Sequence, residues 1–300
     1  MRAEIKPTIL VLAAVPFIMV LGNSMLIPVL PAIQKAVKLN LFQAGLLITA
    51  FSIPAGLVIP FAGILSDRIG RKIVMAPALV IYGTGGLLAG LAAVFLTKPY
   101  PYLIGARIIQ GIGAGGTYQL AMALVGDLIQ DQERAQVLGL LEAANGLGKV
   151  VSPLAGAAIG LIFWYMPFFV YGVLSLPIAA LVFWLVQEPP QSNNKQSFKD
   201  YAHNLYKIFN EKGANLCAAF LSGMVVLFSL FGLLSLLSDL LEKKYHLQIF
   251  QRGLIIAIPV LLMAITSYIL GIILKAQITK IMKWTILVGL SLVALGLFLF

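Results

Sequence analysis

Long apolar stretches alternate with short polar ones along the whole chain. A helix needs about 20 predominantly apolar residues to cross the hydrocarbon core of a bilayer, and the chain reaches such a length nine times. The predicted spans are residues 8–30, 41–65, 73–96, 101–125, 136–161, 165–187, 214–237, 251–274 and 284–300. The pattern therefore predicts an all-α membrane protein whose helices are mostly joined by short loops.

One polar segment, residues 188–213, is much longer than the other connections. Pro189 and Pro190 are expected to end the sixth helix, because proline cannot continue the helical hydrogen bonds. Apolar side chains then recur at helical spacing among lysines, at Phe198, Tyr201, Leu205, Ile208 and Phe209. This spacing predicts an amphipathic helix on the inner membrane face. A helix that binds a partner protein is the alternative.

The segments on either side of this linker are weakly similar to each other. FAGILSDRIGRK ends the second span and ILGIILKAQITK ends the eighth, and their glycines, Gly63 and Gly271, lie 208 positions apart. Such a repeat is typical of transporters built from two related halves. The expected organisation is an N-terminal six-helix bundle at 1–187, a linker at 188–213 and three helices of a second bundle at 214–300. Because six helices should match six, we expect the chain to be truncated.

Composition and charge support the membrane assignment. Hydrophobic residues make up 60% of the chain and charged residues 11%, and the mean hydropathy is +0.98; these values are typical of an integral membrane protein. The net charge of +10 does not indicate nucleic-acid binding, because most Lys and Arg residues lie between apolar runs. With a cytoplasmic N-terminus, 13 basic residues fall on the inner side and 6 on the outer. The positive-inside rule therefore predicts a multi-pass cell-membrane protein with its N-terminus inside.

The short loop GILSDRIGRK, residues 63–72, combines glycines, bases and one acid. Gly70 permits a tight turn, and Gly63 is expected to allow close helix approach. The bases Arg68, Arg71 and Lys72 suit an anionic inner membrane surface. Asp67 gains nothing from that surface, so we expect it to have a partner. The usual excess of basic residues in inner loops would explain the bases, but not the positions of the glycines and the aspartate.

The run LIGARIIQGIGAGG, residues 103–116, places an arginine inside a span. Arg107 lies about six residues into the fourth predicted helix, where a charged side chain costs at least about 2.5 kcal/mol unless it faces protein or water. Gln110 and Tyr118 continue its helical face. We therefore expect a polar stripe inside the bundle, and the alternative is an arginine that extends to the nearby interface.

The fifth predicted helix carries a polar face in EAANGLGKVVSPLAG, residues 142–156. Glu142, Asn145 and Lys149 recur at steps of three or four, which places them on one side of a helix. Glu142 and Lys149 are about 10 Å apart along the helix axis. They share a face, but we expect them to meet poorly as an ion pair.

The same helix carries a row of small residues. Gly148, Ser152 and Gly156 are spaced by four, as in the seams that let membrane helices pack closely. Pro153 is expected to add a kink. The segment therefore reads as a close-packed, kinked helix rather than a damaged span.

Together these motifs resemble the major facilitator superfamily, specifically its drug:proton antiporter group. The family's loop motif is matched by Gly63, Asp67, Arg68, Gly70, Arg71 and Lys72. Its fourth-helix motif is matched by Arg107, Gln110, Gly111, Gly113 and Ala114, and its first-helix motif by Leu21, Gly22, Pro28 and Pro31. Its fifth-helix motif is matched more loosely by Gly148, Pro153 and Gly156, with Ser152 and Ala157 where glycines are usual.

The resemblance implies a fold of two six-helix bundles around a central cavity, with alternating access driven by proton exchange. It implies that Asp67, Arg68 and Arg71 belong to an inner charge cluster that locks the outward-closed state, with Asp127 at the end of the fourth helix as a partner. It also implies that Arg107 assists proton coupling.

Two functional expectations follow from the residues. Glu142 is the only carboxylate well inside a predicted span, so it is the candidate proton carrier. Arg107 and Lys149 outnumber it, so the cavity should favour anionic, zwitterionic or neutral solutes, for instance a siderophore, as readily as drugs. The expected cavity residues are Asn23, Gln110, Tyr118, Asn145 and Lys149.

Several alternatives remain at the sequence level. An importer of the same fold and an inactive truncated remnant are both compatible with the motifs. An enzyme is not supported, because His203 and His246 stand in no catalytic or metal-binding motif. We expect no metal or cofactor, a monomer, and small molecules, protons and the lipid bilayer as partners.

Overall fold

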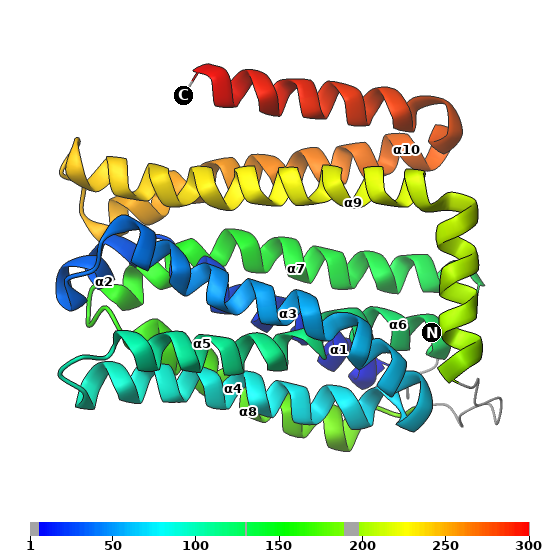
Figure 1. Cartoon of the computed structure of the whole chain (residues 1–300), viewed down its shortest axis with the longest axis horizontal. Coiled ribbons are helices and arrows are strands. Elements are labelled where there is room, and N and C mark those ends of the chain that lie inside the picture. Colours follow the sequence, from blue (N-terminus) through cyan, green and yellow to red (C-terminus); the bar gives the residue numbers. More distant parts are fainter. Residues whose placement is uncertain (1–5, 130, 189–197, 300) are drawn as a thin grey trace. The chain divides into compact units, whose positions relative to one another are not determined.

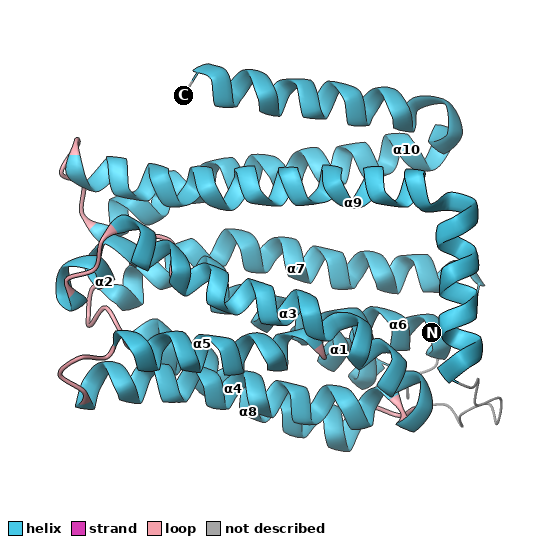
Figure 2. Cartoon of the chain, in the orientation of Figure 1, coloured by secondary structure: helices cyan, strands magenta, loops and turns pink. Residues whose placement is uncertain are grey.

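The computed structural model describes residues 6–129, 131–188 and 198–299. Over these ranges the chain consists of helices, turns and loops, without strands (Figure 2). The helices are α1 Lys6–Ser24, α2 Leu30–Val37, α3 Leu41–Ile69, α4 Arg71–Phe95, α5 Tyr100–Gly115, α6 Tyr118–Leu128, α7 Asp131–Gly160, α8 Met166–Leu185, α9 Phe198–Lys243 and α10 Ile249–Leu299. The all-α prediction is confirmed.

Six helical segments of the described chain are long and apolar enough to cross a membrane. They are Pro7–Ser24, Leu41–Ile69, Arg71–Phe95, Tyr100–Leu128, Met166–Leu185 and Tyr206–Lys243. Two shorter apolar helical segments, Ile249–Met263 and Trp284–Gly296, fall where the last two spans are predicted. The helix α7, at 30 residues, has the length to cross but is more polar. Its passage through the membrane stays a prediction.

Two of the predicted continuous spans are interrupted. The first is helical only to Ser24, turns over residues 25–29 and resumes as α2. Pro28 lies within this break and Pro31 in the first turn of α2, and proline disfavours helix continuation through its missing N–H. The fourth span breaks at Gly116 and Thr117, where the Thr117 hydroxyl donates to the Ala114 carbonyl at 2.7 Å. The sequence pattern missed both breaks because apolar periodicity continues across them.

The helix α9 is longer than predicted. It begins at Phe198 and continues to Lys243, so the amphipathic segment and the seventh predicted span form one helix, which bends sharply near its start in Figure 1. Tyr206, Ile208 and Phe209 are exposed on it. The side chains of Phe198, Tyr201 and Leu205, also named in the amphipathic prediction, lie outside those that are described.

The contacts divide the chain into two compact units. The first comprises residues 1–191 and 238–261, and the second comprises 192–237 and 262–300. The first unit includes the segment around the α9–α10 connection because this segment packs on α2 and α7. The predicted division into a bundle at 1–187, a linker at 188–213 and a second bundle at 214–300 rests on the polar segment and the sequence repeat, not on contacts. It stays a prediction.

Within the first unit, small residues bring helix backbones together. A Cβ added to Gly113 of α5 would lie 2.3 Å from the Tyr82 nitrogen of α4, so only glycine allows this approach. Apolar side chains of the same two helices, such as Leu79 of α4 and Leu103 of α5, are fully buried. Close approach of this kind is how membrane helices gain packing energy, since burial from water contributes little between them.

This first unit has two ends that matter for function. The α3–α4 connection, the end of α6 and the end of α8 lie at one of them, called here the Arg71 end (Figure 1, right). The helix α2 and the α4–α5 and α7–α8 loops lie at the other, called the Lys35 end (Figure 1, left). The groups singled out from the sequence lie at the Arg71 end and in the interior between the two.

Candidate functional site

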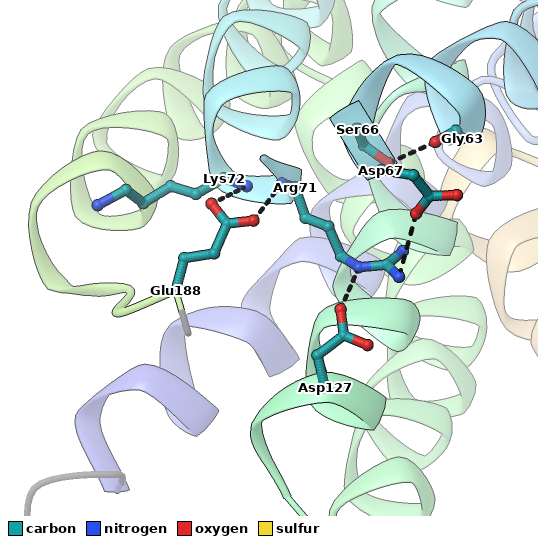
Figure 3. Close-up of polar contacts among 7 residues, drawn as sticks. All are labelled: Gly63, Ser66, Asp67, Arg71, Lys72, Asp127 and Glu188. Carbon is teal, nitrogen blue, oxygen red and sulfur yellow. Dashed lines mark hydrogen bonds and ion pairs between the residues drawn. The ribbon is translucent and has the colours of Figure 1, made fainter. Parts of the chain in front are cut away.

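Arg71 forms the centre of a charge cluster at the Arg71 end. It is the first residue of α4, and its guanidinium lies 3.2 Å from the Asp67 carboxylate, one turn back on α3. Its Nε also donates to the Asp127 carboxylate at the end of α6 (Figure 3). The contact with Asp127 that the family resemblance implies is therefore present. A single arginine joins α3, α4 and α6.

The geometry of the turn explains why Arg71 can reach both acids. Gly70 has φ of 111° and ends α3 while α4 starts at the next residue. Residues that carry a side chain rarely adopt that backbone conformation, so glycine is needed there. Ser66 donates from its hydroxyl to the Gly63 carbonyl at 2.8 Å within the last turns of α3. Arg68 is half-buried in the same segment.

Glu188 is a member of this cluster that the sequence reasoning missed. Its carboxylate accepts the backbone N–H of Arg71 and, at 3.3 Å, that of Lys72 (Figure 3). In the first turn of a helix such N–H groups have no acceptor within the helix. They lie at the positive end of the α4 dipole, where a carboxylate is stabilising. A Cβ added to Gly70 would lie 2.8 Å from Glu188 Oε2. The available signal was a single acid directly after the apolar run of α8.

The side chains of this cluster are only partly shielded from solvent. Arg71 is 20% exposed, whereas Asp67 and Asp127 are 54% and 43% exposed. Ion pairs with that exposure each contribute about 1 kcal/mol or less. Such a cluster can therefore be formed and broken as the helices move, unlike a fully buried one.

Arg107 lies in the interior of the bundle and is completely buried. Its Nε donates to the Leu47 carbonyl at 2.9 Å, and Nη1 donates to the Gly22 carbonyl at 2.8 Å. It also donates to the side-chain oxygens of Gln110, at 2.7 Å, and Asn23. The guanidinium lies 4.5 Å from the centroid of the Phe51 ring, in cation–π geometry.

The four oxygen acceptors of Arg107 are all neutral. No carboxylate is paired with it among the described residues. Asn23 and Gln110 were predicted to line the cavity, but they are buried and act in this structure as hydrogen-bond partners of Arg107. The alternative of an arginine extending to the interface is therefore wrong. The backbone acceptors could not be found from helical spacing, since they belong to α1 and α3.

Two tyrosines beside Arg107 were not singled out from the sequence. Tyr82 donates its hydroxyl to the Ile18 carbonyl at 3.1 Å, and Tyr171 is packed against its ring with centroids 6.1 Å apart. The Tyr171 hydroxyl and Gln110 Nε2 are buried without a described hydrogen-bond partner. Aromatic residues inside apolar runs carry no signal that would have distinguished them.

Glu142 is paired with a tyrosine. The Tyr118 hydroxyl donates to Glu142 Oε1, which joins the start of α6 to the middle of α7. The Glu142 side chain is exposed in the described structure, and Asn145 one turn further is buried with its side-chain oxygen unpaired. The structure thus brings together three of the polar residues singled out from the sequence, namely Tyr118, Glu142 and Asn145. In this contact the phenol keeps its proton and donates a hydrogen bond to the charged carboxylate, which positions it.

Lys149 lies two turns beyond Glu142 and is half-buried. No ion pair joins the two side chains in the described part of the chain. The face of α7 therefore presents an acid and a base at separate depths.

The small residues of α7 lie against the N-terminal segment. A Cβ on Gly156 would be 2.2 Å from the Met25 carbonyl oxygen, and one on Gly148 would be 3.2 Å from that of Phe17. Ser152 is fully buried and donates to the Gly148 carbonyl, in the turn that precedes Pro153. At Gly63, in contrast, an added Cβ would meet no described atom within 4 Å. The close helix approach expected at Gly63 is therefore absent from the described residues.

Comparison with known proteins agrees with this architecture. A sequence model of the Major Facilitator Superfamily matches residues 12–300. The bacillibactin exporter of Bacillus subtilis (strain 168) is 38% identical over 265 residues, which are 88% of this chain and 66% of that protein. Multidrug resistance protein 1 of the same strain is 28% identical over 76% of this chain and 56% of its own length. The chain thus spans 66% or less of the length of these relatives.

Solved structures share the fold. A bacterial homologue of the human lysosomal transporter Spinster, in an inward-facing and unoccupied conformation, superposes with a TM-score of 0.76 at 19% identity, covering 92% of this chain and 64% of that one. The D-xylose–proton symporter has a TM-score of 0.67 at 16% identity, covering 92% and 70%. From the match over residues 12–300 and the 38% identical relative, the chain belongs to the Major Facilitator Superfamily.

Proposed function

We propose that the protein is a proton-coupled efflux transporter of small molecules in the cell membrane, with the Arg71 end facing the cytoplasm. The observation that carries this proposal is the contact between Tyr118 and Glu142, a carboxylate on a helix that is predicted to span the membrane. Ionisable groups at such positions are expensive and are usually functional. Relatives named as a bacillibactin exporter and as multidrug resistance proteins support the outward direction.

Glu142 serves as the proton carrier in this proposal. In its charged form it accepts the Tyr118 hydrogen bond, and in its protonated form it becomes neutral and can itself donate. The loss of charge removes the cost of moving the carboxylate through a less polar environment when access switches sides. Proton binding and the conformational change are then coupled through one group.

The cargo we propose is an anionic or zwitterionic metabolite, such as a siderophore of the bacillibactin type. Lys149 supports this choice, because it shares the α7 face with Glu142 but is not held by it in the described structure. Arg107 does not contribute a positive charge to the cavity, although the sequence suggested that it would. Its guanidinium is buried among neutral acceptors. Lys149 is therefore the candidate contact for an acidic group of the cargo.

The Arg71 cluster has the role of a cytoplasmic gate. It joins the ends of α3, α4 and α6 through pairs that are weak individually, and Glu188 adds the end of α8. A gate that must open in each cycle requires such intermediate strength. Positive-inside charge sorting supports the cytoplasmic location of this end.

The first prediction concerns Glu142. In inverted membrane vesicles that contain the protein, adding a catecholate siderophore should release part of an imposed proton gradient, and Glu142→Gln should abolish that release because glutamine cannot carry a proton. The measurement is fluorescence of a pH-sensitive dye across the vesicle membrane.

Glu211→Gln is the matched control, since Glu211 lies exposed on α9 and its loss removes the same charge. We expect this variant to behave like the parent. Full siderophore-dependent proton movement in Glu142→Gln would contradict the assignment of the proton carrier. Uptake of the siderophore by whole cells, rather than accumulation in inverted vesicles, would contradict the direction.

A further inference from the structure

A second charge cluster lies at the Lys35 end, outside the groups described so far. The Glu242 carboxylate, in the last turn of α9, pairs with Lys35 of α2 through one oxygen and with Arg252 of α10 through the other. The pair with Lys35 joins residues about 200 positions apart within one compact unit, whereas Glu242 and Arg252 are ten positions apart. They connect the N-terminal part of the chain to the α9–α10 corner, residues 238–253.

The two partners of Glu242 differ in exposure. The Arg252 side chain is 3% exposed and that of Glu242 is 12% exposed, whereas the Lys35 side chain is 75% exposed. Removing one partner of a buried pair is strongly destabilising, while an exposed pair contributes little. Arg252 therefore holds Glu242 in position, and Lys35 is the partner that can be released at low cost.

Two backbone contacts dock the same corner. Ser238, one turn before Glu242, is fully buried and donates to the Ile27 carbonyl at 3.0 Å. Ile27 belongs to the break between α1 and α2, and its carbonyl also accepts the backbone N–H of Leu30 at 3.3 Å. Gly253, next to Arg252, lies so close to α7 that a Cβ there would be 2.9 Å from the Pro153 carbonyl oxygen.

A cavity of about 200 Å³ lies beside these contacts. Gln34, Lys35, Asp239, Glu242 and Lys243 contribute to its lining. Gln34 Nε2 and Asp239 Oδ1 are buried without a described partner. A contact made only of apolar side chains would exclude water. A cavity lined by donors and acceptors without partners can instead admit water as the corner and the α1–α2 break separate.

We propose that Lys35, Glu242, Arg252 and Ser238 form a releasable latch that holds the α9–α10 corner on the α1–α2 break and so closes the Lys35 end. Arg252 holds the Glu242 carboxylate in position, and the Ser238 hydrogen bond fixes where the corner lies along the α1–α2 break. The strength of the exposed pair with Lys35 then determines how easily the corner detaches. The latch goes beyond the proposed transport function, and its test requires no transport.

The test uses the rate at which a buried thiol becomes accessible. Leu241→Cys in a Cys217→Ser background, purified in lipid nanodiscs, should react slowly with a maleimide, because position 241 is buried in the same corner while Cys217 is exposed. Lys35→Glu should raise this rate by about fivefold, the factor that loss of about 1 kcal/mol gives in an opening equilibrium. Lys35→Arg should keep the slow rate, since it retains the cation.

Lys98→Glu is the matched control, because Lys98 lies in the α4–α5 loop at the same end and the change in charge is identical. It should leave the rate unchanged. Glu242→Gln, which removes both pairs, should react at least as fast as Lys35→Glu, with thermal melting recorded to show that the variant is folded. The latch is overturned if the parent reacts as fast as an exposed thiol, if Lys35→Glu has no effect, or if Lys98→Glu has an equal effect.

Discussion

At the scale of single residues, Gly70 shows how two demands meet at one position. Its φ of 111° is a conformation that other residues rarely adopt, and the space where a Cβ would lie is taken by the Glu188 carboxylate. The sequence indicated the turn through the glycine but not the carboxylate, because Glu188 is separated from it by five helices. The same limit applied to Arg107, whose burial cost was evident while its backbone acceptors were not.

Gly70→Ala should therefore destabilise the protein by about 1–3 kcal/mol, the range for a residue held in a sparsely populated conformation. The measurement is thermal unfolding in detergent followed by intrinsic fluorescence. Gly63→Ala in the same motif is the control and should be neutral or slightly stabilising, since nothing described lies within 4 Å of the added Cβ.

A double-mutant cycle separates strain from collision at Gly70. In a Glu188→Ala background the penalty of Gly70→Ala should shrink, because only the backbone strain remains. An equal penalty in both backgrounds would mean that the Glu188 carboxylate does not occupy this space in solution.

At the scale of helices, the pairing of α1 with α7 depends on small residues. Gly156 and Gly148 of α7 lie against the Met25 and Phe17 backbones, and the buried Ser152 lies between them. Spacing by four made this row visible in the sequence as a seam. The identity of the partner helix was not visible, because a small-residue row specifies that a neighbour comes close and not which neighbour it is.

Gly156→Ala should push α7 away from Met25, directly after the end of α1, and cost about 1–3 kcal/mol, as overpacking of a tight contact does. Gly139→Ala on the same helix should have no such cost, since its added Cβ has no described neighbour within 4 Å. The midpoint of unfolding in a titration with sodium dodecyl sulfate compares the two variants. Equal midpoints would show that α7 does not pack on α1 at Gly156 in the membrane-like environment.

At the scale of the whole molecule, function depends on which end faces the cytoplasm. The positive-inside rule assigns most basic residues to cytoplasmic segments, among them the α3–α4 turn at the Arg71 end, and α1 begins at that same end. The proposed gate and the proposed latch then lie on opposite sides of the membrane. Their roles in a transport cycle follow from this placement.

Single cysteines test the orientation directly. In a Cys217→Ser background, Lys72→Cys should react with a membrane-impermeant thiol reagent only in inverted vesicles, and Lys98→Cys only in intact cells. The reason is that Lys72 lies at the Arg71 end and Lys98 in a loop at the Lys35 end. The reverse pattern of labelling would invert the proposed topology and with it the direction of export.

The sequence by itself determined the all-α membrane class and most span positions, because apolar run length is a local property that reports directly on the bilayer. It also singled out Asp67, Arg107 and Glu142, since a charge in or beside an apolar run is costly wherever the chain folds. Only the tertiary structure decided the partners of these charges: Asp127 and Glu188 around the α3–α4 turn, neutral oxygens around Arg107, and Tyr118 at Glu142. These contacts join helices far apart in the chain, so no local pattern records them.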